Sequence, residues 1–369
     1  MKKKILVFHP SLAPYRVDFF NACHEFFDAV FYFNLTNVSD QKFDQEALKS
    51  KCNFKCNYLT KGFDLFNRSF RVGIIPLIVR EKPDIVLCSE YGPITLMVFI
   101  YKKLFNRSFK IYSISDDSID NAISRKGLRS LLRNLICKRA DGVIFTSSEV
   151  SNWHKENISR KINVMELPII HNEKIFRTEL TKSIAIANKN ILKYNLLNKK
   201  VLLFVGRLVT VKNLHFLMRT FRLVKDENVV LVIVGDGILF NQLKTLSKTY
   251  SKSNEIIFTG RKEGLELLSW YLVGSVFVLP STHEPFGAVV NEALISGCYT
   301  LCSSKAGASS LINSLNGRLF NPFNEENLLE CIEQSLSYND YLSGEISMLR
   351  KNKMPFLFDE KISNLLKNL

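Results

Sequence analysis

The chain has 369 residues, of which 46% are hydrophobic and 23% are charged. This length excludes a single compact core and predicts two domains, and the composition excludes a disordered or fibrous chain. The formal net charge of +15 predicts an anionic partner, such as nucleotide phosphates, acidic membrane lipid or nucleic acid.

The cysteines and the apolar runs indicate an intracellular protein. The eight cysteines are scattered, and Cys52 and Cys56 have no second pair that would complete a zinc site or a disulfide framework. A reducing cytosol therefore fits best. The start MKKKILVF is like a signal peptide, but its apolar run stops at His9, and Ile94–Tyr101 is well short of the roughly 20 residues that span a bilayer. We expect a cytoplasmic protein that meets the inner face of the membrane only by peripheral docking.

Short apolar runs alternate with helical patterns, which predicts an α/β protein with parallel sheets covered by helices on both faces. The predicted strands are Lys4–Phe8, Ala29–Phe33, Ile85–Cys88, Lys110–Ile114, Gly142–Phe145, Val201–Val205, Val229–Val234, Glu255–Phe258, Ser275–Leu279 and Cys298–Cys302. Two runs of five strands predict two Rossmann-like domains. We expect them at residues 1–180 and 181–352, followed by a terminal helix at 353–369.

Polar side chains follow the predicted strands of the first domain. Tyr15 and Arg16 follow the first strand, Glu90 follows the strand DIVLCS, and Asp116 and Asp117 follow KIYSIS. Ligands of open parallel sheets bind at these carboxyl ends. Arg16 either holds a phosphate or carboxylate of a ligand or caps a loop at the surface. Either aspartate can accept a proton, or one of them caps a helix.

Residues 124–140, SRKGLRSLLRNLICKRA, contain basic side chains, no acid, and leucines at helical spacing. This pattern predicts a basic amphipathic helix that docks on anionic lipid through Arg125, Lys126, Arg129 and Arg133. The alternative is an ordinary domain helix whose apolar face packs on the sheet and whose charges lie in water.

The second domain begins with VLLFVGRLVTVKN. Gly206 and Arg207 leave the strand Val201–Val205, and Lys212 lies just before a helical pattern. A strand end and a helix start would then present two cations and free N–H groups to a diphosphate.

A second candidate site follows the apolar run VFVL. Glu284 lies in the loop after this strand, Gly287 opens a helix and lets a ligand approach the backbone, and Glu292 lies among apolar residues of that helix. A carboxylate in so apolar a helix is costly unless something binds it, and a pair of sugar hydroxyls would serve. The alternative is that both glutamates are solvated.

Seven residues separate Glu284 from Glu292, with Phe286-Gly287 between them. This resembles the E-x7-E signature of the retaining GT-B glycosyltransferases of family 4, the glycosyl transferases group 1. The G-R-x4-K run ending at Lys212 resembles the diphosphate-binding element of that family, and the likeness runs from about residue 200 to 330. The first domain departs from the family, because paired glycines are missing after the first strand and Ser115-Asp116-Asp117 replaces a common histidine.

The resemblance implies a GT-B fold, with two Rossmann-like domains facing a cleft and the C-terminal helix packed back on the N-terminal domain. It assigns donor binding to Gly206, Arg207, Lys212, Arg261, Phe286, Gly287 and Glu292, and the acceptor side to Tyr15, Arg16 and Glu90. Glu284 would contact the donor sugar, and Asp116 and Asp117 are candidates for the catalytic base. The expected co-substrate is a nucleoside-diphosphate sugar, with no metal and no other cofactor.

We therefore expect a retaining glycosyltransferase that moves a sugar to a lipid-linked or saccharide acceptor, in bacterial surface polysaccharide synthesis. An epimerase or phosphorylase of the same fold is the alternative within enzymes. A basic nucleic-acid-binding protein is the alternative outside them, but the basic residues do not interleave with aromatics in a recognised module, so we expect no nucleic acid partner.

Overall fold

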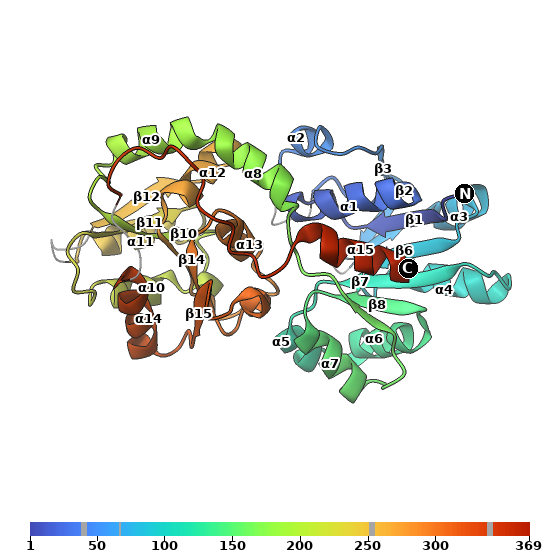
Figure 1. Ribbon diagram of the computed structural model, residues 1–369. Coiled ribbons are helices and arrows are strands. Elements are labelled where there is room, and N and C mark those ends of the chain that lie inside the picture. Colours follow the sequence, from blue (N-terminus) through green and yellow to red (C-terminus); the bar gives the residue numbers. More distant parts are fainter. Residues whose placement is uncertain (38–42, 66–67, 251–254, 338–341) are drawn as a thin grey trace. The chain divides into compact units, whose positions relative to one another are not determined.

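The computed structural model describes residues 1–37, 43–65, 68–250, 255–337 and 342–369 (Figure 1). The chain divides into two compact units, Met1–Ile169 with Asp359–Leu369 and Ile170–Phe358. The division comes before the predicted boundary at residue 180, because helix α8 (Glu173–Lys182) packs on α12 (Gly264–Val273) and α13 (Ala288–Ile295) of the second unit.

The first unit is built on a parallel sheet with seven strands in the described part of the chain, in the order β3-β2-β1-β6-β7-β8-β9. The strands are β1 (Lys4–His9), β2 (Asp28–Phe33), β3 (Cys56–Tyr58), β6 (Ile85–Ser89), β7 (Lys110–Ser115), β8 (Gly142–Phe145) and β9 (Val164–Glu166). A separate antiparallel pair joins β4 (Gly62–Leu65) and β5 (Arg68–Arg71). The helices are α1 (Pro14–Phe26), α2 (Gln45–Lys49), α3 (Ile74–Glu81), α4 (Pro93–Leu104), α5 (Ile119–Ser124), α6 (Gly127–Arg139), α7 (Ser148–Asn157) and α15 (Phe358–Asn368).

Along each strand, alternate side chains point to opposite faces of this sheet. Leu6 and Phe8 pack with α3 and α4, whereas Phe31 and Phe33 of β2 contact the ring of Phe20 on α1. The other part of the α4 face is covered by α6 and α7, which pack on Val143 and Phe145 of β8. These helices thus cover the sheet with their apolar sides, which fixes the strand ends that carry the polar residues.

The C-terminal helix α15 belongs to the first unit. It begins at Phe358, later than the predicted residue 353 and after Pro355. The Tyr112 hydroxyl of β7 donates to the carbonyl oxygen of Leu369 at 3.3 Å, and Ile362, Leu365 and Leu369 are buried.

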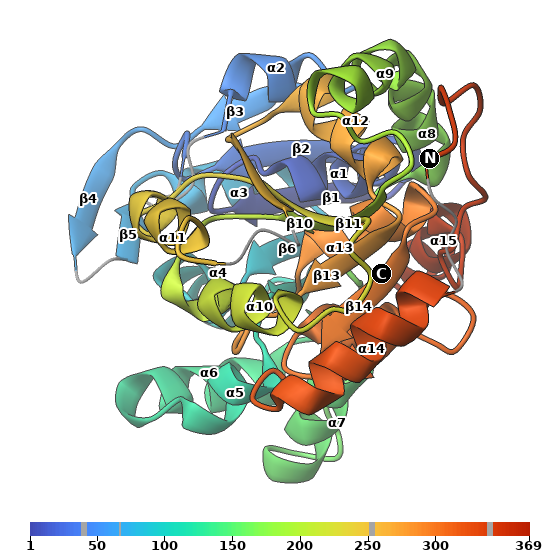
Figure 2. The ribbon, with the colours of Figure 1, turned by 90° about the vertical axis from the view of Figure 1, so that its left-hand side faces the viewer.

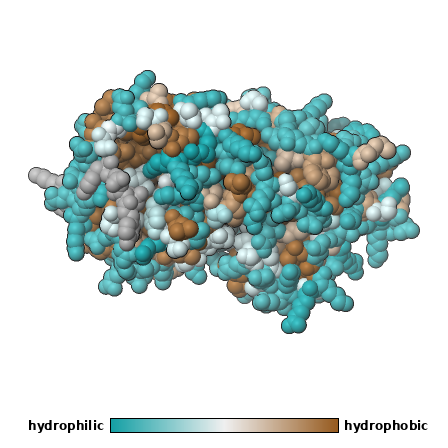
Figure 3. Space-filling view, in the orientation of Figure 1, coloured by the Kyte–Doolittle hydropathy of each residue, from teal (hydrophilic) through white to brown (hydrophobic). Residues whose placement is uncertain are grey.

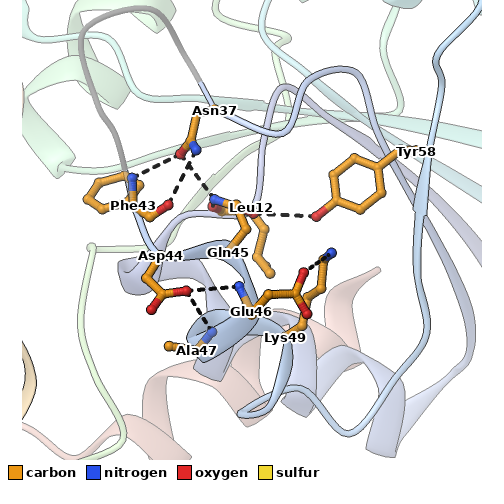
Figure 4. A network of polar contacts seen from close by, with 9 residues as sticks. All are labelled: Leu12, Asn37, Phe43, Asp44, Gln45, Glu46, Ala47, Lys49 and Tyr58. Atoms are coloured by element: carbon orange, nitrogen blue, oxygen red, sulfur yellow. Dashed lines mark hydrogen bonds and ion pairs between the residues drawn. The ribbon is translucent and has the colours of Figure 1, made fainter.

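A polar network holds the segment around α2 against the loop that leads into α1 (Figure 4). The Gln45 side-chain amide donates to the Leu12 carbonyl at 3.2 Å and to Asn37 Oδ1 at 3.1 Å. Asp44 caps α2 by accepting from the backbone N–H groups of Glu46 and Ala47, each at 3.1 Å. The network thereby fixes the loop that ends just before Tyr15 and Arg16.

The second unit is also built on a parallel sheet, with six strands among the described residues in the order β12-β11-β10-β13-β14-β15. The strands are β10 (Lys200–Val205), β11 (Val229–Val234), β12 (Glu255–Gly260), β13 (Val276–Leu279), β14 (Tyr299–Ser303) and β15 (Gly317–Phe320). Beyond α8, α12 and α13, the helices are α9 (Ile184–Lys193), α10 (Leu214–Phe221), α11 (Phe240–Ser247) and α14 (Glu325–Ser337), with short 3-10 turns η1 (Thr210–Lys212) and η2 (Gly307–Leu311). Figure 2 shows α9 and α12 on one side of this sheet and α10 and α14 on the other.

The structure confirms the α/β class and the ten predicted strands, with bounds shifted by at most two residues. No helix in the described part of the chain is long and apolar enough to span a bilayer.

Candidate active site

The second unit brings Lys212 and Glu284 together. Strands β10 and β13 are parallel neighbours, so the loops at their carboxyl ends lie side by side. Lys212 ends η1 after β10, Glu284 lies in the loop after β13, and their side chains form an ion pair. The two side chains are only 11% and 15% exposed, so the pair is largely buried.

Gly287 shapes the same loop at the start of α13. Its φ of +96° lies in the left-handed region, which favours glycine. A Cβ atom here would come within 2.9 Å of Leu279 Cδ2 and 3.2 Å of Glu284 Cγ. Gly287 therefore allows Glu284 to sit beside the N-terminus of α13, where unpaired N–H groups and the helix dipole favour an anion.

Glu292, one helical turn further along α13, has two side-chain partners that the sequence reasoning missed. The Tyr271 hydroxyl donates to Glu292 Oε2 at 2.6 Å, and His171 Nε2 lies 3.5 Å from Oε1. Burial, followed by the charge of Glu292, raises the pKa of Tyr271 well above its usual value, so the phenol stays a proton donor. His171 is held in turn by its backbone N–H, which donates to Asn291 Oδ1 at 2.8 Å.

Arg207 is an exposed cation of this region. It follows Gly206, whose φ is +155°, in the loop between β10 and η1 that also carries Lys212. Among the residues that the structure describes, no hydrogen bond or ion pair engages its guanidinium. Arg207 is thus available to a ligand at the edge of the sheet where Lys212 and Glu284 meet.

Arg261 and Phe286, which were also predicted to bind the donor, lie in other surroundings than Lys212 and Glu284. Arg261 follows β12, at the edge of the sheet and two strands away from β10, and pairs with Glu263 in an exposed position. Phe286 is 2% exposed, so only its backbone can meet a ligand. Ser281, just after β13, is fully buried, and its hydroxyl has no hydrogen-bond partner within the described ranges.

In the first unit, Arg16 is buried rather than exposed. Its guanidinium pairs with Asp116, and its side chain is 1% exposed, whereas the Asp116 side chain is 31% exposed. The Arg16 guanidinium carbon also lies 6.0 Å from the centre of the Tyr15 ring. Buried His9, with Nδ1 2.8 Å from the Ser11 carbonyl, has its pKa lowered to about 4 by burial and then by Arg16.

Asp116 and Asp117 point to different environments. Asp117 is 3% exposed and pairs with Arg125. Burial raises the pKa of Asp117 above its usual value, and the charge of Arg125 opposes this shift. Asp117 is thus the buried carboxylate of the two and Asp116 the solvent-reaching one, and the assignment of a catalytic base to either stays a prediction. Glu90, at a φ of +53°, accepts hydrogen bonds through its carbonyl from Ser113 and Thr95.

The four residues predicted to dock on a membrane lie in two different environments. Arg133 is 4% exposed, donates to the Ala122 carbonyl at 2.5 Å and lies over the Trp153 ring. With Arg125 paired to Asp117, two of the four predicted residues point inward, which corrects the prediction for them. Lys126 and Arg129 are exposed.

Comparison with known proteins gives a family for the second unit. Residues 188–345 match the family described as Glycosyl transferases group 1. Uncharacterized glycosyltransferase MJ1607 of Methanocaldococcus jannaschii is 32% identical over 142 residues, which are 38% of this chain and 36% of that protein. Uncharacterized glycosyltransferase MJ1069 of the same organism is 26% identical over 298 residues, 77% of this chain and 70% of that protein. The match to the first of these relatives therefore spans little more than a third of its length.

Solved structures agree in fold. Anabaena HepE, solved in complex with UDP and glucose, has a TM-score of 0.70 at 16% identity and covers 100% of both chains. The lipopolysaccharide outer core galactosyltransferase WaaB has a TM-score of 0.69 at 18% identity and covers 99% of this chain and 100% of that chain. These likenesses show the GT-B fold that the sequence predicted. The residues that match the glycosyl transferases group 1 family, 188–345, include Arg207, Lys212, Glu284 and Glu292.

Proposed function

We propose that this chain is a retaining glycosyltransferase that takes a sugar from a nucleoside-diphosphate sugar. The observation that carries the proposal is the meeting of Lys212 and Glu284 beside the N-terminus of α13, with the exposed Arg207 on the same loop as Lys212. This combination offers positive charge and N–H groups to a diphosphate and a carboxylate to the sugar attached to it. The family match and the UDP and glucose bound to HepE support this donor class.

Each donor contact has a chemical role in the proposal. Glu292, oriented by Tyr271 and His171, accepts hydrogen bonds from the ribose hydroxyls. Arg207, Lys212 and the backbone of Phe286 and Gly287 bind the diphosphate. When the bond between sugar and phosphate breaks, negative charge grows on the leaving phosphate, and fixed cations and N–H donors stabilise it.

Glu284 and Lys212 act together in the proposed reaction. The ion pair holds the Glu284 carboxylate near the start of α13, where it orients the sugar close to the reacting carbon. Lys212 keeps its contact with Glu284 while it also meets the diphosphate. Side-chain cations and a helix N-terminus supply the charge, so the proposal needs no metal ion or cofactor beyond the co-substrate.

We propose the first unit as the acceptor side. Asp116 is the carboxylate that reaches solvent, and Arg16, which lies near the Tyr15 ring, holds it in place. The acceptor hydroxyl would meet Asp116, on a lipid-linked or saccharide acceptor in bacterial surface polysaccharide synthesis. WaaB is a lipopolysaccharide outer core galactosyltransferase, which supports this acceptor class.

A thermal-shift screen with nucleotide sugars tests the donor first. A ligand at 100 times its Kd stabilises the folded protein by about 2.7 kcal/mol, so a true donor raises the Tm. Mass spectrometry then follows the donor with candidate acceptors, and we expect a glycosylated acceptor and free nucleoside diphosphate. Formation of an isomerised donor or a sugar phosphate without a glycosylated acceptor would instead identify an epimerase or phosphorylase.

Two single substitutions test the proposed roles of Arg207 and Glu284. Arg207→Ala and Glu284→Ala should abolish transfer while the circular dichroism spectrum stays that of the wild type. Lys189→Ala, an exposed lysine on α9 of the same unit, is the matched control and should retain full activity. Full transfer activity in Arg207→Ala or in Glu284→Ala would contradict the proposal.

A further inference from the structure

Cys52 and Cys56 differ from the other cysteines of the chain in their exposure. All eight cysteines are free thiols, and these two are partly exposed. The other six are buried: Cys23, Cys88, Cys137, Cys298, Cys302 and Cys331. A reagent that attacks thiols from water therefore meets Cys52 and Cys56 first, because burial keeps it from the others.

The two cysteines lie at one end of the sheet of the first unit. Cys52 follows α2, and Cys56 is the first residue of β3, which is the last strand at that end of the strand order. In Figures 1 and 2, α2 is an outer helix of the first unit, and Figure 3 shows that hydrophilic residues cover most of the visible surface. A small polar oxidant in water can therefore approach a partly exposed thiol here.

The segment between the two cysteines is fixed on α1 and on the sheet. The Asn21 side-chain amide of α1 donates to the Lys51 carbonyl at 2.9 Å, and Asn21 Oδ1 accepts from the backbone N–H of Asn53 at 2.9 Å. The Phe54 ring packs on Phe31 of β2, with ring centroids 4.0 Å apart. The fold thus sets the backbone from which both thiols extend.

The two thiols contact each other through a hydrogen bond, and Cys52 Sγ also lies 3.4 Å from the Leu48 carbonyl oxygen. The hydrogen bond with Cys52 lowers the pKa of Cys56 below its ordinary value. Burial opposes this shift, and the charge of Lys49 on α2 adds to it. The same hydrogen bond, followed by burial, raises the pKa of Cys52. Cys56 is therefore the thiol that ionises first, while Cys52 keeps its proton.

We propose that Cys52 and Cys56 form a site of reversible oxidation, at which a peroxide converts the two thiols into a disulfide. The Cys56 thiolate attacks one oxygen of hydrogen peroxide, the O–O bond breaks, and the other oxygen leaves as water once it is protonated. The Cys56 sulfur is then a sulfenic acid. The sulfur of Cys52 attacks it, the Cys52 proton is given up, and the hydroxyl leaves as a second water.

The atoms and electrons of this step balance. Two thiols and one hydrogen peroxide give one disulfide and two waters, and the two electrons pass from the sulfurs to the peroxide. A dithiol reductant reverses the step by thiol–disulfide exchange. Transient disulfides of this kind are compatible with a reducing cytosol.

A metal ion does not explain the pair, since no group of three or more His, Cys, Asp or Glu side chains in the described part of the chain could hold one. The inference also goes beyond the proposed sugar transfer, because neither cysteine is among the residues proposed to meet the donor or the acceptor.

Mass spectrometry of the full chain tests the site. The reduced protein is mixed with hydrogen peroxide, its remaining thiols are blocked with N-ethylmaleimide in urea, and it is digested with trypsin without a reductant. Trypsin cuts after Lys51, Lys55 and Lys61, so Cys52 and Cys56 fall on separate peptides, CNFK and CNYLTK. We expect these peptides to be linked after peroxide treatment and separated by dithiothreitol, whereas the six buried cysteines carry N-ethylmaleimide.

Single substitutions separate the roles of the two thiols. Cys56→Ser should slow the reaction with peroxide about tenfold or more, because the remaining thiol keeps its proton. Cys52→Ser should leave the sulfenic acid of Cys56 unresolved, so dimedone labels it. Lys49→Met should slow the first step about twofold to fivefold, as the loss of a partly exposed charge implies. The matched control, Lys189→Met on α9, should react as the wild type does.

Other results overturn the proposal. They are absence of the linked peptides after peroxide treatment, oxidation of the buried cysteines as fast as Cys52 and Cys56, or a linkage that joins two copies of the chain on a non-reducing gel. Disulfide formation that is as fast in the urea-unfolded chain as in the folded one would also contradict it, because the folded arrangement of the thiols would then contribute nothing.

Discussion

The Tyr271 hydroxyl on α12 donates a 2.6 Å hydrogen bond to Glu292 Oε2 on α13. Tyr271 is fully buried, whereas the Glu292 side chain is 18% exposed, so the bond fixes a carboxylate that solvent can still reach. With His171 near the other oxygen, Glu292 is oriented before any ligand arrives.

This arrangement predicts the effect of Tyr271→Phe. The variant removes one hydrogen bond to a charged group, worth about 1.5–3 kcal/mol, and frees the Glu292 rotamer. We expect the Kd for the donor to rise about tenfold, with a smaller change in kcat, measured by calorimetry and steady-state kinetics. Tyr194→Phe on the neighbouring segment is the control and should leave the Kd unchanged. An unchanged donor Kd in Tyr271→Phe would show that Glu292 does not bind the donor or needs no orientation.

The ion pair of Lys212 and Glu284 predicts energetic coupling. Lys212→Met and Glu284→Gln each leave the partner partly buried without an opposite charge, which should lower the free energy of unfolding by about 1–3 kcal/mol. The double variant should lose less than the sum of the two. Urea denaturation of the four proteins in a double-mutant cycle measures this coupling. Additive losses would mean that the pair does not form in solution.

The backbone at Gly287 predicts a cost for any side chain. Gly287→Ala must adopt a φ of +96° and push Leu279 and Glu284 aside, so we expect a loss of more than about 1 kcal/mol in stability together with reduced transfer. Gly264→Ala separates the effect of the positive φ from the effect of the clash with Leu279 and Glu284. Gly264 also has a positive φ, of +53°, but an added Cβ there would have no atom within 4 Å. The control should lose stability only, and equal loss of transfer in both would contradict a role for the space beside Glu284.

Two buried histidines predict acid sensitivity of the first unit. Burial is the main cause that lowers the pKa of His9 and of His154 to about 4, from an ordinary value of 6.5. Between these values the unfolded chain binds protons that the folded chain does not, so stability falls as pH falls from about 6.5 to 4, by up to about 3 kcal/mol for each histidine. Urea unfolding across this range should show a shallower fall in His154→Gln than in the wild type. Equal slopes would contradict the burial of a neutral His154.

Much of the fold could be predicted from the sequence because parallel strands buried on both faces are continuous apolar runs. VVLVIV at Val229–Val234 is fully buried and was predicted with the bounds that the structure gives. The strands of the two sheets that were missed, β3, β9 and β15, are short and contain half-exposed or exposed residues, and the separate antiparallel pair β4 and β5 was missed as well. Pairing with a neighbour, rather than their own composition, makes them strands.

Only part of the candidate site could be predicted from the sequence. Lys212 and Glu284 could be placed together because both follow strands that a Rossmann-like sheet brings side by side. The partners Tyr271 and His171 could not, because neither lies in a motif and their contacts depend on how α12 and the start of the second unit pack. Asp116 and Asp117 are adjacent in sequence, yet only the structure shows that one reaches solvent and the other pairs with Arg125.

The position of α15 has a consequence for biosynthesis. The first unit receives this helix only after the ribosome has made the whole of the second unit, since α15 follows Phe358 in the chain. During translation, the nascent first unit must wait with the surface around Tyr112 uncovered while some 190 further residues emerge and fold. The order of synthesis thus delays completion of the first unit until the whole of the second unit has been made.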